Sequence, residues 1–192
     1  MKIVERTIVR DIDVRRDAVI WNYLDFEHLA RVHHGYVSAE LIYEDENVAL
    51  EHLTLRVPFL PFLHSRSTHF IVKRLPEEIL AWNVGLFAIP SATRIQLDAL
   101  SPQRCRVSVT HRFALVGIRR IFAPLLPLFI RRWNEKVWRE DLPLKLRREE
   151  VLQRGFMDFN PRAGAPYSIR QSLLFPFPHG PFSTLMHDWI AR

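Results

Sequence analysis

Hydrophobic and polar side chains alternate with a period of two along residues 105–115. One face would carry mostly apolar residues and the other polar ones, namely Cys105, Val107, Val109, His111, Phe113 and Leu115 against Arg106, Ser108, Thr110 and Arg112. This pattern is typical of an antiparallel strand with one buried and one solvated face. Strand-like segments also occupy residues 3–14, 41–43, 49–57, 64–75, 80–87 and 93–99, so we expect a sheet of about seven strands.

Two parts of the chain change to helical spacing. Residues 15–34 carry apolar side chains three or four positions apart, too irregularly for one helix, so they predict two short helices with Asp25 as a cap of the second. From residue 124 to residue 151 a longer stripe predicts a C-terminal helix, which Gly155 ends. We expect Pro143 to kink or split this helix because it lacks a backbone N–H donor.

The order of these elements predicts an α+β domain over residues 1–155. The sheet must bury its apolar face, and the long C-terminal helix is the obvious cover. A curved sheet wrapped on a helix often leaves a cavity that suits an apolar ligand. The candidate walls of this cavity, for which plain core packing is the alternative, are Trp82, Phe87, Phe113, Trp133 and Val137. Residues 156–192 are rich in proline and aromatic residues, and we expect them to form a tail outside the domain.

Composition narrows the classes of function. The chain has 192 residues and a formal net charge of +6, but its basic residues are spread out and form no nucleic-acid-binding motif, so we expect no nucleic-acid partner. The single cysteine, Cys105, excludes an intramolecular disulfide and a cysteine-rich metal cluster held by this chain alone, which fits a reducing, cytoplasmic location. The longest apolar run, residues 121–130, is too short for a transmembrane segment, and no secretory signal is visible.

Two segments, Ala18–His33 and Cys105–Leu115, carry a resemblance to a known superfamily. In their setting of strand, short helices, antiparallel strands and closing helix, they resemble the helix-grip (SRPBCC) proteins, which include START lipid-binding domains, Bet v 1-like allergens and polyketide cyclases. The resemblance covers about residues 1–155. It implies the helix-grip fold and a hydrophobic or aromatic small-molecule ligand, handled either by a metal-free binding or carrier protein or by a cyclase or aromatase.

A shorter pattern is more specific. Asp25, His28 and His33 form the motif Asp-x2-His-x4-His, which resembles the iron-ligand segment in the catalytic domains of Rieske-type aromatic-ring oxygenases. Residues 137–143 resemble the helix that supplies the third ligand there. The resemblance implies a mononuclear Fe(II), or Zn(II), bound by His28, His33 and Asp141, with Asp25 as the catalytic residue that orients a histidine and relays an electron. Since this chain cannot hold a Rieske cluster, an oxygenase would need an external electron donor or partner subunit.

The residues themselves leave alternatives open. Five positions along an unbroken α-helix rotate a side chain by roughly 140°, so His28 and His33 can reach one metal only if the helix bends or ends between them. His34 could replace His33 and Glu140 could replace Asp141, whereas Asp141 could also be a solvated partner of Lys145 one turn away. Both histidines could equally be ordinary residues of the helical lid.

His111 lies on the apolar side of the most regular strand. It is either a satisfied core histidine or a general base for a cyclisation reaction.

Overall fold

The computed structural model describes residues 1–57, 60–85 and 89–155. Phe87 and the expected tail over 156–192 lie outside this range. The elements, in chain order, are β1 (Lys2–Ile12), α1 (Arg16–Leu24), the 3₁₀ helix η1 (Phe26–His28), α2 (Leu29–Val32), β2 (Tyr36–Glu44), β3 (Val48–Val57), β4 (Leu60–Arg74), β5 (Glu78–Val84), β6 (Pro90–Ser101), β7 (Arg104–Leu115), the 3₁₀ helix η3 (Gly117–Phe122) and α3 (Leu126–Gln153).

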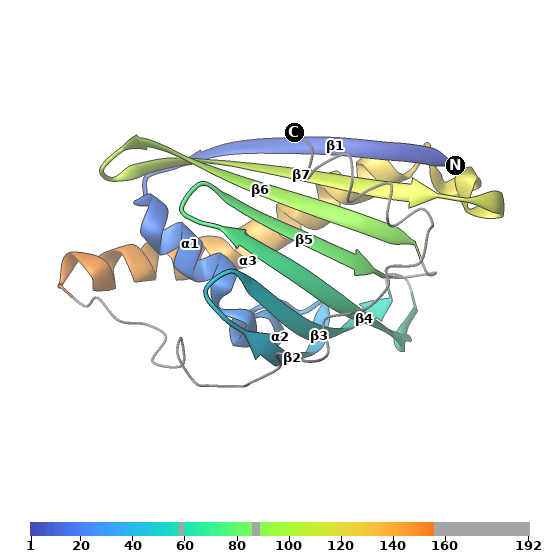
Figure 1. Ribbon diagram of the computed structural model, residues 1–192, viewed down its shortest axis with the longest axis horizontal. Coiled ribbons are helices and arrows are strands. Elements are labelled where there is room, and N and C mark those ends of the chain that lie inside the picture. The colour runs from blue at the N-terminus through green and yellow to red at the C-terminus, as the bar shows by residue number, and fades with distance from the viewer. Residues whose placement is uncertain (58–59, 86–88, 156–192) are drawn as a thin grey trace.

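The strands form a single curved antiparallel sheet in the order β1-β7-β6-β5-β4-β3-β2 (Figure 1). Strands β2 to β7 pair with their neighbours in sequence, as expected where short turns separate alternating segments. β1 lies beside β7 at the far edge, so the two short helices α1 and α2 cross from that edge to β2. The seven strands and the α+β helix-grip architecture are confirmed.

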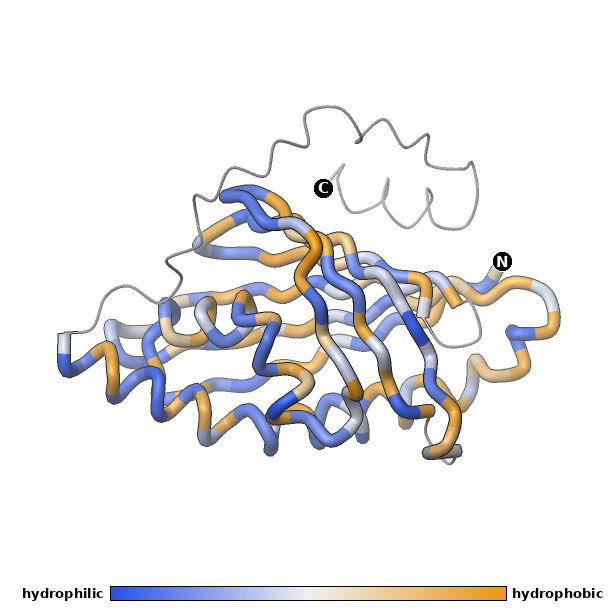
Figure 2. The backbone as a smooth tube through the Cα atoms, turned by 90° about the horizontal axis from the view of Figure 1, so that it is seen from below, coloured by the Kyte–Doolittle hydropathy of each residue, from blue (hydrophilic) through white to orange (hydrophobic). Residues whose placement is uncertain are grey.

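α3 covers one face of this sheet and runs behind it in Figure 1. The core between them contains strand residues from alternate positions, among them Ala49, Ile71, Ile79 and Val107, and α3 contributes Trp138 and Leu142 to it. Hydrophobic and hydrophilic positions alternate along the strands in Figure 2, as a sheet with unlike faces requires.

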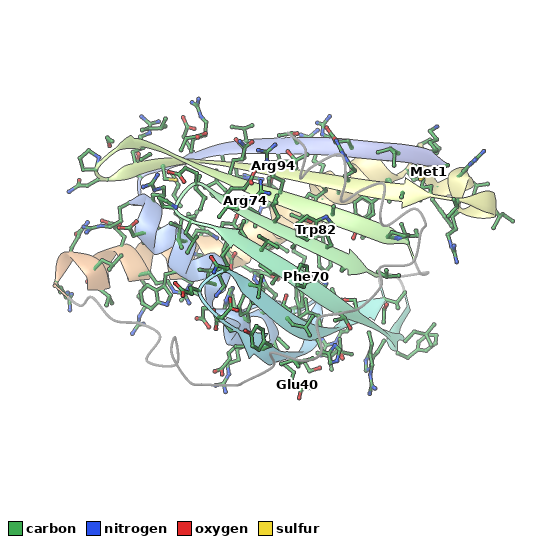
Figure 3. The ribbon with its side chains drawn as sticks, in the orientation of Figure 1. Met1, Glu40, Phe70, Arg74, Trp82 and Arg94 are labelled. Carbon is green, nitrogen blue, oxygen red and sulfur yellow. The ribbon has the colours of Figure 1, made fainter. Side chains whose placement is uncertain are left out.

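Trp82 lies on the opposite face of the sheet, which corrects its expected place as a wall of the ligand cavity. It is 1% exposed and packs with Leu80, Ala92 and Phe70, with its ring centroid 6.1 Å from that of Phe70 (Figure 3). Successive side chains of a strand point to opposite faces. β5 is apolar on both faces, so its pattern alone does not reveal which face meets α3.

α3 is one helix of 28 residues that runs through Pro143 without interruption. The expected split at this position is therefore wrong. Pro143 is exposed, and its ring removes only the hydrogen bond to the carbonyl one turn earlier, so the packing of the flanking turns on the sheet and α1 keeps the helix whole. Over the ranges that the structure describes, no helix is long and apolar enough to cross a membrane.

Candidate functional site

The structure brings His28, His33 and Asp141 together. His28 ends η1, His33 follows α2, and Asp141 lies in the middle of α3. One side-chain donor atom of each lies within 4.8 Å of the other two, and all three residues are buried. The Nε2 atoms of His28 and His33 lie 3.2 Å and 3.0 Å from the same oxygen, Oδ1 of Asp141. Donors bound to one divalent ion at about 2.0–2.2 Å lie about 3.0–3.4 Å apart, so these two spacings are compatible with a shared metal, and they are also those of direct contacts between the imidazoles and the carboxylate.

The chain bends between the two histidines as convergence requires. α2 has only four residues, and His33 already has an extended backbone, with φ −99° and ψ 117°. The next residue, His34, is exposed, and its backbone carbonyl accepts a hydrogen bond from Arg56 Nη1 at 3.1 Å. The geometry therefore places His33 rather than His34 beside Asp141.

Each histidine is held through its other ring nitrogen. His28 Nδ1 contacts the backbone carbonyl of Asp25, and His33 Nδ1 lies 2.9 Å from Oε2 of Glu140. Both partners are hydrogen-bond acceptors, so Nδ1 is the donor in each contact and Nε2 faces Asp141. Such outer contacts fix the tautomer and orientation of metal-binding histidines. Glu140, considered above as an alternative to Asp141, contacts His33 from the side away from the other donors.

The electrostatics of the cluster keep Asp141 ionised. Burial alone would raise the pKa of Asp141, but its contacts with His28 and His33 and the nearby Lys145 ammonium hold that pKa well below its usual range. Burial alone would lower the pKa of His33, yet its contacts with Asp141 and Glu140 raise it. His33 Nε2 has no hydrogen-bond geometry to a partner within the described residues although Asp141 is 3.0 Å away.

Lys145 is part of the cluster, and only its burial was not indicated by the sequence pattern. Its Nζ donates a hydrogen bond to Oδ2 of Asp141 at 2.8 Å, and its side chain is completely buried. The ammonium also lies 5.1 Å and 5.0 Å from the ring centroids of Tyr23 and Trp138. The Asp141–Lys145 pair considered as an alternative is therefore present, but it is buried rather than solvated.

The side chain of Asp25 makes a different contact from the expected one. Its carboxylate contacts the guanidinium of Arg148 on α3, which also donates to Oδ1 of Asn22 at 3.0 Å. It is the backbone carbonyl of Asp25, not the carboxylate, that touches His28. No side-chain cap hydrogen bond is made by Asp25 at the start of η1. An electron-relay role for Asp25 stays a prediction.

The other candidate residues occupy separate places. His111 lies on the α3 side of the sheet with Nδ1 3.1 Å from Oγ1 of Thr93, and burial lowers its pKa to about 4. Phe113 packs in a small core near the start of α3. The Trp133 ring lies 6.0 Å from that of Tyr36, which in turn lies 5.6 Å from the ring of His33. Val137 is half-buried on α3, one turn before Asp141.

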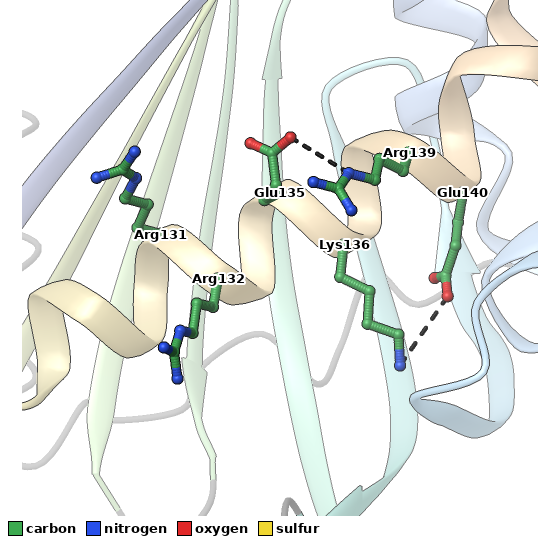
Figure 4. Close-up of a pocket in the computed structure, with 6 residues that line it drawn as sticks. All are labelled: Arg131, Arg132, Glu135, Lys136, Arg139 and Glu140. Atoms are coloured by element: carbon green, nitrogen blue, oxygen red, sulfur yellow. Dashed lines mark ion pairs between the residues drawn. The ribbon is translucent and has the colours of Figure 1, made fainter.

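A charged pocket of about 680 Å³ lies along α3 (Figure 4). It is lined by Arg131, Arg132, Glu135, Lys136, Arg139 and Glu140. Its side chains pair with one another, at 3.4 Å between Glu135 and Arg139 and 4.0 Å between Lys136 and Glu140. The charged side chains of this lining differ from the apolar walls expected of the ligand cavity.

Comparison with known proteins identifies the fold. No family model and no curated protein sequence matches this chain. Among solved structures, it is similar to the Zhui aromatase/cyclase of Streptomyces sp. R1128, with a TM-score of 0.64, 13% identity, and coverage of 78% of this chain and 95% of that one. A START superfamily protein of Mycobacterium smegmatis has a TM-score of 0.58 and 11% identity, with coverage of 78% of this chain and 98% of that one. Human STARD10 has a TM-score of 0.59 and 11% identity, with coverage of 78% of this chain and 68% of that one. At these identities the likeness shows the helix-grip fold alone.

Proposed function

We propose that this protein binds a hydrophobic small molecule between its sheet and α3, and that His28, His33 and Asp141 hold a divalent metal ion beside it. The observation that carries the metal site is the convergence of three buried donor atoms from two distant segments within 4.8 Å. The ligand class is supported by the helix-grip fold, in which the sheet and its helix can enclose an apolar molecule.

The donor set fits such an ion. Two imidazole nitrogens and one carboxylate oxygen suit Fe(II) or Zn(II) and leave coordination positions open. Asp25 and Glu140 hold the rings of His28 and His33 through Nδ1, and Lys145 holds the far oxygen of Asp141. A bound ion would supply Lewis-acid chemistry with Zn(II) or redox chemistry with Fe(II) at the open positions.

An oxygenase reaction at this site would require electrons from another protein. The one cysteine, Cys105, is buried, and burial raises the pKa of its thiol to about 11, so it is a poor cluster ligand. If the protein is an oxygenase, an external electron donor or partner subunit must therefore supply the electrons.

A metal-free binding protein or cyclase is the second candidate function. The ammonium of Lys145, 2.8 Å from Asp141, already neutralises the carboxylate and so weakens its attraction for a cation. The similarity to the Zhui aromatase/cyclase is in keeping with this candidate. In a cyclase, the neutral imidazole of His111 could accept a proton from the ligand.

Metal analysis distinguishes the two candidates. Protein purified without oxygen is assayed for bound elements and titrated with Fe(II) and Zn(II) by calorimetry. The metal proposal expects one ion per chain, with affinity at least about a hundredfold lower in His28→Ala and Asp141→Asn. His34→Ala is the matched control, since this exposed neighbour should not change the affinity. A wild-type protein that binds neither ion stoichiometrically would leave the metal-free candidate.

Binding of a hydrophobic molecule is tested separately. The fluorescence of 1-aminoanthracene should rise on binding to the folded protein, and Val137→Trp should weaken binding about tenfold by filling space one turn from Asp141. Leu146→Trp, at an exposed position on the same helix, is the control. If Val137→Trp binds the probe as the wild type does, the ligand does not lie beneath this part of α3.

A further inference from the structure

A row of polar residues crosses the α3-facing side of the sheet, apart from the histidine cluster. Glu51 on β3 is in register with His69 on β4, His69 with Asn83 on β5, and Asn83 with Ser91 on β6. These four residues form what we call the polar row. In the next row toward the core, the positions on β3, β4 and β5 are apolar and pack under the helices, namely Ala49, Ile71 and Ala81. Since side chains two positions apart share a face, the polar row also faces α3.

Glu51 is the least satisfied member of the polar row. It is 3% exposed, and its Oε2 has no hydrogen-bond partner within the described residues. Its other oxygen lies 3.4 Å from Nδ1 of His69, whose Nε2 is 3.1 Å from Oγ of Ser67. A buried polar atom without a partner costs free energy, and it therefore calls for an explanation, such as a ligand.

Burial makes both neighbours neutral near pH 7. It raises the pKa of Glu51 to about 8 and lowers the pKa of His69 to about 4. A protonated carboxyl is a hydrogen-bond donor, whereas a carboxylate only accepts. In apolar surroundings such a carboxyl can donate to a carbonyl oxygen.

The polar row lies close to the histidine cluster. Tyr36 on β2 interacts with both: its ring centroid lies 5.6 Å from that of His33, and the charge of Glu51 is among the causes, after burial, that raise its pKa. One elongated ligand could therefore reach both.

A second polar pair lies in the row next to the polar row. Thr93 on β6 is in register with His111 on β7, one row further toward the core, and His111 Nε2 is another buried atom without a partner in the described part of the chain. Two buried atoms without a partner among the described residues, Glu51 Oε2 and His111 Nε2, therefore lie on the same face of the sheet.

We propose that the polar row is a binding site for the oxygen atoms of an otherwise hydrophobic ligand, with Glu51 donating a hydrogen bond to a ligand carbonyl. The inference rests on the proposed binding of a hydrophobic molecule under α3, and it specifies that molecule as a ketone or related oxygenated compound. It does not depend on the metal.

A matched pair of probes tests this proposal. 2-Acetylnaphthalene and 2-ethylnaphthalene have nearly the same shape, but only the first carries a carbonyl oxygen. The wild type should bind the ketone at least about tenfold more tightly, because the hydrocarbon leaves buried polar atoms unpaired. Glu51→Leu should remove this preference, whereas Glu51→Gln, which keeps a donor, should retain most of it. Glu40→Leu is the control, since Glu40 is an exposed acid on the neighbouring strand (Figure 3).

The possible results separate the two proposals. Equal wild-type affinities for ketone and hydrocarbon, or an unchanged ratio in a folded Glu51→Leu, would overturn the role of the polar row while leaving hydrophobic binding intact. Failure of the wild type to bind either probe would contradict hydrophobic binding itself, and the polar row with it. Circular dichroism and thermal unfolding of each variant establish that it is folded. If Glu51→Leu does not fold, Glu51→Gln carries the test, and it must bind the ketone more tightly than the hydrocarbon at pH 7.

Discussion

Lys145 donates a hydrogen bond to Oδ2 of Asp141 at 2.8 Å, while the two histidines approach Oδ1 of the same carboxylate. The carboxylate therefore has the Lys145 side chain on one side and the two histidine nitrogens on the other. Burial lowers the pKa of Lys145, but the charge of Asp141 opposes this shift. The ammonium both supports the fold and competes with any metal for the carboxylate charge.

Lys145→Met should strengthen metal binding and weaken the metal-free fold. Removing the ammonium frees the charge of Asp141, so Zn(II) affinity should rise about tenfold. Without metal, the loss of a buried partner should lower the free energy of unfolding by about 3–5 kcal/mol. Calorimetry and thermal unfolding with and without Zn(II) measure both effects. Lys136→Met, at an exposed position on α3, is the control, and a Zn(II) affinity that does not rise in Lys145→Met would argue against metal at Asp141.

Arg148→Met should destabilise the turn that carries His28. Arg148 is buried and joins α3 to Asn22 and to the Asp25 carboxylate, with its guanidinium 4.5 Å from the ring centroid of Trp21. Since Asp25 remains partly solvated, we expect a loss of about 2–3 kcal/mol in the free energy of unfolding by urea. Arg147→Met, an exposed neighbour, should change it by less than about 0.5 kcal/mol. Equal effects of the two variants would contradict this role.

Glu51→Gln should change how stability depends on pH. The pKa of Glu51 is about 8 in the folded protein and 4.5 in its ordinary state, so folding retains a proton on this group. The stability that this proton contributes is complete below about pH 4.5 and is lost as pH rises to about 8. The wild type should therefore lose up to about 1.4 kcal/mol per pH unit relative to Glu51→Gln within this window. Urea unfolding at pH 5, 6.5 and 8 measures the difference, and parallel profiles would show that Glu51 is not shifted.

Gly35→Ala should disturb the chain next to His33. A Cβ atom at position 35 would lie 2.7 Å from Cη2 of Trp133, which is too close for a carbon–carbon contact. We expect a loss of about 1–3 kcal/mol in unfolding free energy and weaker Zn(II) binding. The double variant Gly35→Ala/Trp133→Phe should recover most of the loss, because phenylalanine lacks the outer ring atoms. Additive effects of the two changes would show that this contact is not the cause.

Local pattern was sufficient for the architecture, whereas the candidate metal ligands came from a resemblance that left His33 and Asp141 open to alternatives. Alternation along β7 and the helical stripe of α3 predict the sheet and its cover, because backbone geometry sets these periods within a single element. The spacing of His28 and His33 would separate their side chains on a continuous helix, and they converge because α2 ends after four residues. Only the structure distinguishes Asp141 from Glu140, since adjacent helical positions differ by about 100° and the register of α3 against η1 decides which faces the histidines.

Trp82, Lys145 and Glu51 show where local pattern is insufficient. Trp82 lies on a strand that is apolar on both faces, and Lys145 and Glu51 are of a residue type that is usually exposed to solvent. Their burial depends on which distant element covers each face, and their pKa values depend on how much water that cover removes. Sequence thus determined the elements and their order, because these follow from interactions a few residues apart. Tertiary structure alone decided which polar groups share a dry interior, because their partners come from segments far apart in the chain.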